Sequence, residues 1–377
     1  MADTPLEDIP EPDRVEGAPH PRETVRVIGH EAAQAEFLAS FNTGRLHHGW
    51  LITGPRGVGK ATLAWKIARF LLATPDDDGG MFAAPPPATL DIPDDHPVAR
   101  RLRALAEPRL FLLRRAWDEK KGKLQDIISV DEVRRMKSFF TLSAADGGRR
   151  VAIIDDADEL NSSAANALLT LLEEPPAGVT ILLISHQPFR LLPTIRSRCR
   201  ELRLSPLAPV PLSDALTQAG GDVDPADRQA LAELAGGSVG EAFRLTNLDG
   251  LKHYAAIVAL FATLPRMDRA RAISLAEAGA GRSVDQFDLI VTLLDQFLAR
   301  MARAGATGHL PPDAAPNEGA LFTRLCPDAR SALGWADLAQ TLSIRARRGK
   351  AVNLDPAALL MDMVLKVDET AGMLPPR

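Results

Sequence analysis

A glycine-rich stretch close to residue 55 limits the folds open to this chain more than any other part of the sequence. Gly54 is followed by four residues and then by Gly59 and Lys60, which matches the pattern G-x-x-x-x-G-K-[ST] up to its last position. Glycines at this spacing let the backbone curl so that successive N–H groups point at an anion. The apolar run 50–53 precedes the loop, and residues 60–72 have apolar side chains at helical spacing. Because a strand and a helix flank the loop, a phosphate-binding loop is favoured over a chance glycine turn.

The loop differs from the pattern at the position after the lysine. Ala61 stands where a Ser or Thr hydroxyl would hold Mg²⁺ beside the β- and γ-phosphates. Thr62 comes one residue late, and neighbouring side chains on a helix diverge by about 100°. The backbone amides and the charge of Lys60 do not need that hydroxyl, so binding of ATP or ADP stays open, with Mg²⁺ held weakly or not at all. The predicted nucleotide-contacting residues of the loop are Gly54, Pro55, Arg56, Gly57, Val58, Gly59, Lys60, Ala61 and Thr62.

Two acids follow a second apolar run. Residues 151–154, VAII, are typical of a buried strand, and Asp155 and Asp156 come directly after them. A strand that delivers a carboxylate at its C-terminal end can set it against a Mg²⁺-bound phosphate, which is the role predicted for Asp155. Asp156 stands where an ATPase usually has Glu to orient the attacking water, and its side chain is one methylene shorter. The alternative is a solvated acidic turn, which the phosphate loop makes the weaker hypothesis.

Strands and helices alternate along the first half of the chain. The segment 164–174 has helical apolar spacing that Pro175 ends, and a third apolar strand spans 180–185. Alternation of this kind predicts a parallel sheet with right-handed crossovers, which is an α/β domain. We predict this domain over residues 23–206.

The other segments differ in character. Residues 1–22 are rich in acids and prolines and are predicted to be a disordered tail, and residues 74–97 are predicted to be a surface insertion. Helical spacing without strands predicts a small helical domain over 207–248 and a larger one over 249–377. In the larger domain, residues 283–301 are predicted to form an amphipathic helix. Its apolar face comprises Phe287, Ile290, Leu294, Phe297 and Leu298.

Composition limits the class of protein. With 377 residues, 46% of them hydrophobic, and a formal charge of −5, we expect a soluble protein of two or three domains, not a dedicated nucleic-acid coat protein. Cys199 and Cys326 are the only cysteines, so neither a disulfide framework nor a four-thiolate zinc site is predicted. The acidic N-terminus is unlike a signal peptide, and the apolar runs are too short to cross a bilayer. We expect a cytoplasmic protein without membrane contact.

Three arginines stand close together in PTIRSRCREL: Arg196, Arg198 and Arg200. An isolated arginine run usually forms a solvated basic edge. A guanidinium is always charged and can hydrogen-bond a γ-phosphate in fork geometry, so the other interpretation is an arginine finger that acts on a neighbouring subunit's nucleotide.

The stretches GPRGVGK, VAIIDDAD, NALLTLLEEPP and SRC, in this order and spacing, resemble a bacterial sliding-clamp loader subunit of the AAA+ ATPase class. The resemblance implies an α/β ATPase domain, a small helical lid and a helical collar that joins five subunits in a ring. It makes Lys60 the phosphate lysine and Asp155 the metal acid. Ser185 or His186 falls at the polar sensor of the γ-phosphate, and Arg198 becomes the finger.

The departures from this family gather in one site. Ala61 replaces the metal hydroxyl, Asp156 replaces the base, and Gly240 stands where the family's ATPase subunits have a sensor arginine in the lid. Losing such groups in phosphoryl transfer typically lowers the rate by orders of magnitude. Arg198, which would act on another subunit's nucleotide, is intact. This combination resembles the family's stator subunit, with its own ATPase weak or absent. Four-cysteine zinc modules are frequent in that subunit, but the present chain has no such cysteines, and no zinc is predicted.

The resemblance also implies partners. They are gamma or tau and delta subunits in a heteropentamer of the DNA polymerase III holoenzyme, a DNA-directed DNA polymerase, with the sliding clamp and primed DNA bound through the assembly. Two alternatives stay open. A catalytically active gamma- or tau-type ATPase would need Thr62 and Asp156 to substitute for the usual groups, and a small-molecule kinase would need an acceptor site that the helical half does not offer. Positive charge at Arg134, Arg135 and Lys137 could face a duplex, although a solvated helix face is favoured.

Overall fold

The computed structural model describes residues 11–24, 26–75, 85–142, 148–281 and 284–373, and these divide into two compact units. The first unit runs to Gly220 and includes the segment Ser238–Gly240. The second unit comprises Gly221–Gly237 and the chain from Glu241 onward. Residues of the predicted lid, 207–248, are therefore divided between the units, and the boundaries proposed for lid and collar stay predictions.

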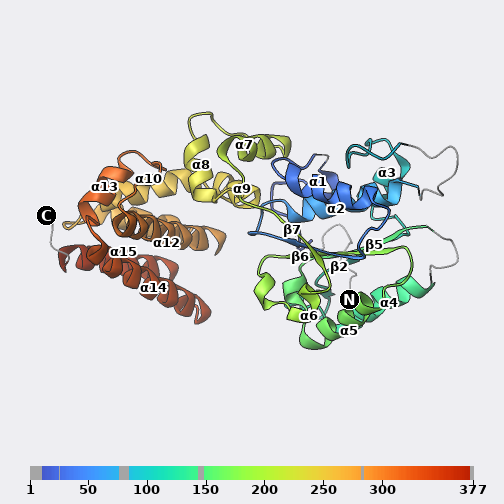
Figure 1. Ribbon diagram of the computed structural model, residues 1–377. Helices are drawn as coiled ribbons and strands as arrows, with labels where there is room; N and C mark the ends of the chain where they lie inside the picture. Colours follow the sequence, from blue (N-terminus) through green and yellow to red (C-terminus); the bar gives the residue numbers. More distant parts are fainter. Residues whose placement is uncertain (1–10, 25, 76–84, 143–147, 282–283, 374–377) are drawn as a thin grey trace. The chain divides into compact units, whose positions relative to one another are not determined.

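The first unit is built on a five-stranded parallel sheet with the order β2-β5-β6-β1-β7 (Figure 1). The predicted strands 50–53, 151–154 and 180–185 lie in β1, β5 and β6. Together with the helices between the strands, this confirms the predicted α/β fold with a parallel sheet. The strands are β1 (Gly49–Thr53), β2 (Leu110–Leu113), β5 (Arg150–Ile154), β6 (Val179–Ser185) and β7 (Arg200–Arg203).

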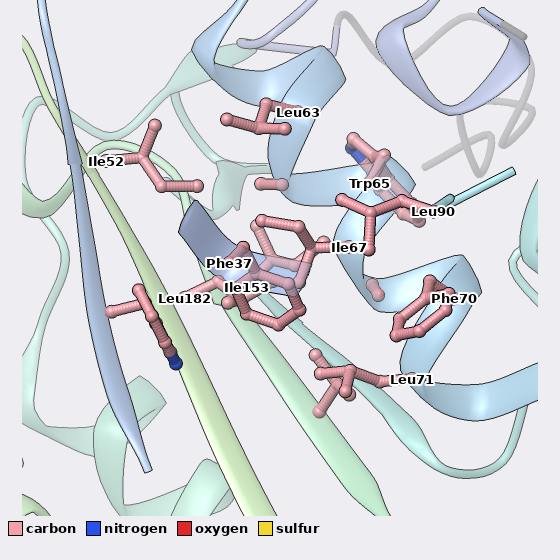
Figure 2. Packing of buried hydrophobic residues seen from close by; sticks show 14 of the residues in the cluster. Phe37, Ile52, Leu63, Trp65, Ile67, Phe70, Leu71, Leu90, Ile153 and Leu182 are labelled. Carbon is pink, nitrogen blue, oxygen red and sulfur yellow. The ribbon is translucent and has the colours of Figure 1, made fainter. Parts of the chain in front are cut away.

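Helices cover both faces of this sheet (Figure 1). One face packs against α1 (Glu31–Asn42), α2 (Lys60–Ala73) and α3 (Pro97–Arg103). The other packs against α4 (Val130–Leu142), α5 (Ser162–Glu173) and α6 (Pro193–Arg196). Alternate residues of each strand face opposite layers, so both cores are continuous. In the first core, α2 side chains pack on strand side chains (Figure 2); those labelled are Leu63, Trp65, Ile67, Phe70 and Leu71 on the helix and Ile52, Ile153 and Leu182 on the strands.

Two strands of the sheet were not predicted. The strand β7 has the sequence RELR, in which only Leu202 is buried, so it has no apolar run and reads as a charged segment. The strand β2 has the sequence LFLL, which is too short for periodicity to separate strand from helix. After β2, a short antiparallel hairpin joins β3 (Trp117–Asp118) to β4 (Lys123–Leu124).

Residues 11–24, which we name the N-terminal strap, pack on the α/β unit. The strap contains the short 3₁₀ helix η2 (Pro21–Glu23). The Asp13 carboxylate lies 2.9 Å from His20 Nε2 and 2.9 Å from Arg114 Nη1. His20 is 1% exposed and meets the Trp65 ring edge-on. Residues 11–22 thus differ from the predicted disordered tail, because buried ion pairs with an arginine distant in sequence hold them, while residues 1–10 lie outside the described residues.

The predicted insertion, residues 74–97, is described only in part, because residues 76–84 lie outside the described residues. Its later half packs on α2: Leu90 is 3% exposed, and Lys66 Nζ lies 2.7 Å from the Asp91 carboxylate. The insertion ends where α3 begins, with the His96 ring accepting a hydrogen bond from the Val98 amide as the N-terminal cap.

After β7, the first unit continues through α7 (Pro209–Gln218), and the second unit is helical. Its longest described helix, α12 (Val284–Thr307), covers the predicted amphipathic segment 283–301 except residue 283, which lies outside the described residues. All five predicted apolar residues are at most 5% exposed. Among the described residues, no helix is both long and apolar enough to cross a membrane. The other helices that follow α7 are α8 (Arg228–Ala235), α9 (Val239–Asn247), α10 (Gly250–Phe261), α11 (Arg269–Gly279), α13 (Glu318–Leu325), α14 (Ala329–Ala351) and α15 (Pro356–Met373).

A buried polar network crosses the second unit. Glu318, in α13, is fully buried and accepts the Tyr254 hydroxyl and the Ala314 amide. Arg300, in α12, donates to both Glu318 carboxylate oxygens at 3.1 Å and to Glu233 of α8 at 3.0 Å. Since each charged group has several partners, the network joins four helices through satisfied hydrogen bonds.

Candidate nucleotide site and arginine finger

The glycine-rich loop joins β1 to α2 at the carboxyl end of the sheet, where the sequence analysis predicts it. Gly54 and Gly57 have φ values of 144° and 75°, which residues with a side chain rarely adopt. An added Cβ at Gly54 would collide with the Leu204 carbonyl oxygen. The Val58 carbonyl lies 2.7 Å from His30 Nε2, so a histidine from α1's N-terminus fixes the end of the loop. The loop therefore has the curled backbone that an anion site requires.

Lys60 turns back onto its own loop. Its Nζ donates to the carbonyl oxygens of Gly54 at 2.8 Å and Pro55 at 2.6 Å, and the residue is only 3% exposed. Burial lowers the pKa of Lys60 to about 8, against the opposing charges of Asp156 and Asp155. The ammonium group is thus held at the mouth of the loop by backbone acceptors.

The segment Ser238–Gly240 lies directly on this loop. The Gly240 amide donates to the Gly57 carbonyl at 3.1 Å. An added Cβ at Gly240 would lie 3.2 Å from Gly57 Cα, and one at Gly57 would collide with the Ser238 hydroxyl. Val15 of the N-terminal strap also approaches Gly240. The position where the resemblance expects a sensor arginine is therefore a close backbone contact, in which an added Cβ would push Gly57 by a few tenths of an ångström.

The two predicted acids lie in different surroundings. Asp155 follows β5 and is 9% exposed. Burial, with the charges of Asp13 and Asp156 in addition, raises the pKa of Asp155 to about 8. The Asp156 carboxylate lies 2.9 Å from His186 Nε2 and accepts the Asp158 amide at 3.0 Å. Burial alone would raise the pKa of Asp156, but the hydrogen bond and charge of His186 hold it below its ordinary value.

Asp158, which the sequence analysis did not select, joins the predicted sensor residues to the acidic turn. Its carboxylate accepts the Ser185 hydroxyl at 2.6 Å and the amides of His186 and Gln187 at 2.6 and 2.9 Å. Ser185 is fully buried. The structure thus brings Ser185, His186 and Asp156 together at the ends of β5 and β6. The only signal for Asp158 in the sequence was its place in the acidic run DDADE.

The arginine run divides into three separate contacts. Arg196 stacks on Phe189, with its guanidinium carbon 5.4 Å from the ring centre. Arg200 lies over the Trp50 ring at 5.5 Å. Arg198 forms an ion pair with Glu173 at 2.9 Å and donates to a backbone carbonyl of α6 at 3.2 Å.

Arg198 lies at the opposite end of the sheet from the glycine-rich loop. Its carbonyl oxygen would be 3.2 Å from a Cβ at Gly49, the first residue of β1, whereas the loop begins at Gly54 after the last residue of that strand. Five residues of strand span about 16 Å. Arg198 therefore cannot reach the phosphate loop of its own chain.

In the part of the chain that the structure describes, no group of three or more His, Cys, Asp or Glu residues is arranged to hold a metal ion. Cys199 and Cys326 lie in different units. Burial raises the pKa of the Cys199 thiol to about 12, which leaves it protonated at neutral pH.

Comparison with known proteins relates this site to replication proteins. Residues 29–208 match a family model described as "DNA polymerase III, delta subunit". DNA polymerase III subunit delta' of Pseudomonas aeruginosa is 40% identical over 40% of this chain and 41% of its own length. The delta' subunit of Escherichia coli is 34% identical over 56% of this chain and 58% of its own length. Over these ranges the chain is similar to subunits of DNA polymerase III.

Subunits of a second kind match as well. DNA polymerase III subunit tau of Escherichia coli is 27% identical over 94% of this chain and 48% of its own length. The chain spans about half the length of the curated relatives that it matches. Among solved structures, a DNA polymerase III gamma subunit-related protein of Thermotoga maritima covers 89% of this chain at 17% identity, with a TM-score of 0.37.

The match to the DNA polymerase III family model covers most of the candidate site. Residues 29–208 include the glycine-rich loop, both acids, the sensor positions and Arg198. Gly240 lies outside the matched range.

Proposed function

We propose that this chain is a delta-prime subunit of the bacterial DNA polymerase III clamp loader. In this role it hydrolyses ATP weakly or not at all and donates Arg198 to the ATP site of a neighbouring gamma or tau subunit. The position of Arg198 supports the proposal most strongly, because its half-exposed guanidinium lies beyond the start of β1, out of reach of the phosphate loop of its own chain and open to a group from another chain.

The chain's own site supports the same function. Ala61 offers no hydroxyl for Mg²⁺, and the Asp156 carboxylate is engaged by His186 instead of being free for a water. The Ser185 hydroxyl donates to Asp158, so the hydroxyl of the predicted sensor already has a hydrogen-bond partner within the chain. Gly240 supplies no cation. A nucleotide, ATP or ADP, would be held by the loop amides of residues 54–62 and by Lys60, and its role would be structural.

The proposed partners are gamma or tau and delta subunits in a cytoplasmic heteropentamer. The helical second unit would supply the contacts that close the ring, and the sliding clamp and primed DNA would be bound through the assembly. A delta-prime chain of this kind would be needed for DNA replication without carrying out a chemical step itself.

A gamma- or tau-type ATPase is the second candidate. The tau relative of Escherichia coli matches 94% of this chain, a larger share than either delta' relative does. This candidate requires Asp156 to leave His186 and orient a water, and it leaves the exchange of a sensor arginine for Gly240 without a reason.

The test compares two variants in a loader reconstituted with gamma or tau, delta, sliding clamp and primed DNA. We expect Arg198→Ala to lower stimulated ATP turnover by about tenfold or more, since arginine fingers contribute large factors to phosphoryl transfer. Lys60→Ala should leave turnover within about twofold, because the hydrolysed nucleotide is held elsewhere. Arg200→Ala is the matched control, because Arg200 contacts Trp50 of its own chain. If Lys60→Ala does the greater damage, the chain is itself a motor and the proposal is wrong.

A further inference from the structure

Two bonds hold the guanidinium group of Arg198 in the isolated chain. Arg198 Nη2 lies 2.9 Å from Glu173 Oε1, and Nη1 donates to the Thr194 carbonyl at 3.2 Å. A guanidinium has five N–H donors in a rigid fork, so these two bonds leave donors for a third group. The Arg198 side chain is 38% exposed, which leaves part of the fork open to solvent.

Both anchors of the guanidinium belong to rigid elements. Glu173 is the last residue of α5, and Leu171 and Leu172 beside it are 3% and 2% exposed in the core under the sheet. Thr194 lies in α6, whose Ile195 is fully buried in the same core. The backbone segments that carry both partners of Arg198 are therefore anchored in the core of the α/β unit.

We propose that Glu173 is a positioning residue for Arg198. Its carboxylate holds the guanidinium in the orientation that binds the phosphates of a neighbouring subunit's nucleotide. The Arg198 side chain therefore loses less rotamer freedom when it binds the phosphate. Glu173 touches neither nucleotide nor reacting atoms and acts only through Arg198. This inference rests on the proposed function, since it assigns a supporting residue to the finger.

The opposite interpretation of the same contact is an inhibitory one. In that case the Glu173 carboxylate would compete with the phosphate for Arg198, and removal of Glu173 would raise ATP turnover. Positioning is favoured because the contact to Glu173 uses one end of the fork and leaves other donors open. The pair is also half-exposed, with 38% and 45% of the side chains accessible. Such a pair contributes little to folding, so a variant at Glu173 should remain folded.

The experiment measures kcat and KM for ATP in the reconstituted loader with clamp and primed DNA. Glu173→Gln keeps the shape of the side chain and removes its charge, and we expect kcat to fall about two- to fivefold with KM unchanged, the range that an exposed ion pair supports. Glu173→Asp should recover part of the loss. Glu174→Gln is the matched control, because Glu174 is the exposed neighbour at the same helix end. The kcat and KM of this variant should equal those of the unsubstituted protein.

The Arg198→Ala background separates positioning from other roles. In a protein that already carries Arg198→Ala, Glu173→Gln should have no further effect on kcat, because Glu173 acts on the reaction only through Arg198. An unchanged or raised kcat with Arg198 present, or an equal loss with Arg198 absent, overturns the positioning role alone. If Arg198→Ala itself leaves turnover unchanged, the proposed function fails and the positioning role fails with it.

Discussion

The Gly240 amide donates a hydrogen bond to the Gly57 carbonyl at 3.1 Å, so two residues without side chains bring the segment Ser238–Gly240 onto the backbone of the glycine-rich loop. An added Cβ at Gly240 would lie 3.2 Å from Gly57 Cα, which is backbone and cannot turn aside. In the family that the sequence resembles, ATPase subunits have an arginine at this position. Glycine at this position therefore offers no cation, and it lets the two backbones approach more closely than a residue with a side chain would without a shift.

Gly240→Ala should destabilise the protein relative to a matched glycine substitution. Both Gly240 and Gly372 lie in helices, so each gains helix propensity from alanine. An added Cβ at Gly372 meets no atom within 4 Å, whereas an added Cβ at Gly240 would lie only 3.2 Å from Gly57 Cα. We expect Gly240→Ala to have a free energy of unfolding about 1–3 kcal/mol below that of Gly372→Ala, measured by urea denaturation. Equal stability of the two variants would show that the contact with Gly57 yields without penalty.

The thiol of Cys199 should resist alkylation until the pH is high. Burial raises its pKa from 9.0 to about 12, so the folded protein keeps this proton through a window in which the unfolded chain loses it. The folded state thus binds more protons, and this group's contribution to stability falls as pH rises from 9 to 12. At pH 8 we expect iodoacetamide to modify Cys199 at least about 100-fold more slowly in the folded than in the denatured protein.

Mass spectrometry of the peptide that contains Cys199 gives this rate without removing Cys326. The rate should rise about tenfold per pH unit between pH 9 and 11, because the thiolate is the reactive species. A plateau near pH 9 would mean that the thiol ionises normally and is open to solvent.

Removing the Glu318 carboxylate should destabilise the second unit strongly. Glu318→Ala leaves Arg300 with one fewer carboxylate partner in a buried position, and the Tyr254 hydroxyl loses its acceptor. We expect a loss of about 3–5 kcal/mol in the free energy of unfolding, which chemical denaturation measures. Asp362→Ala is the control: it breaks an ion pair with Arg345 whose side chains are 50% and 38% exposed, and the expected loss is below about 1 kcal/mol. Similar losses for the two variants would contradict a structural role of the buried network.

The parts that sequence reasoning predicted correctly are local ones. The loop around Gly59, the strand before Asp155 and the apolar face of α12 are each specified by residues within a few positions of one another, and their periodicity is visible in the chain. The strand β7 could not be predicted in this way. Its residues are mostly charged, and it is a strand because β1 offers a parallel partner along its length.

The sequence by itself determined the class of fold and the chemical departures of the site, since a missing hydroxyl at Ala61 or a missing cation at Gly240 is a property of the residue. Only the tertiary structure decided what the remaining groups contact. It joined Asp13 to Arg114, His186 to Asp156 and Glu173 to Arg198, and it separated Arg198 from the loop by the length of β1. These contacts join residues 25 to 101 positions apart in the chain. Such distances are set by strand order and register, which no local pattern of residues encodes.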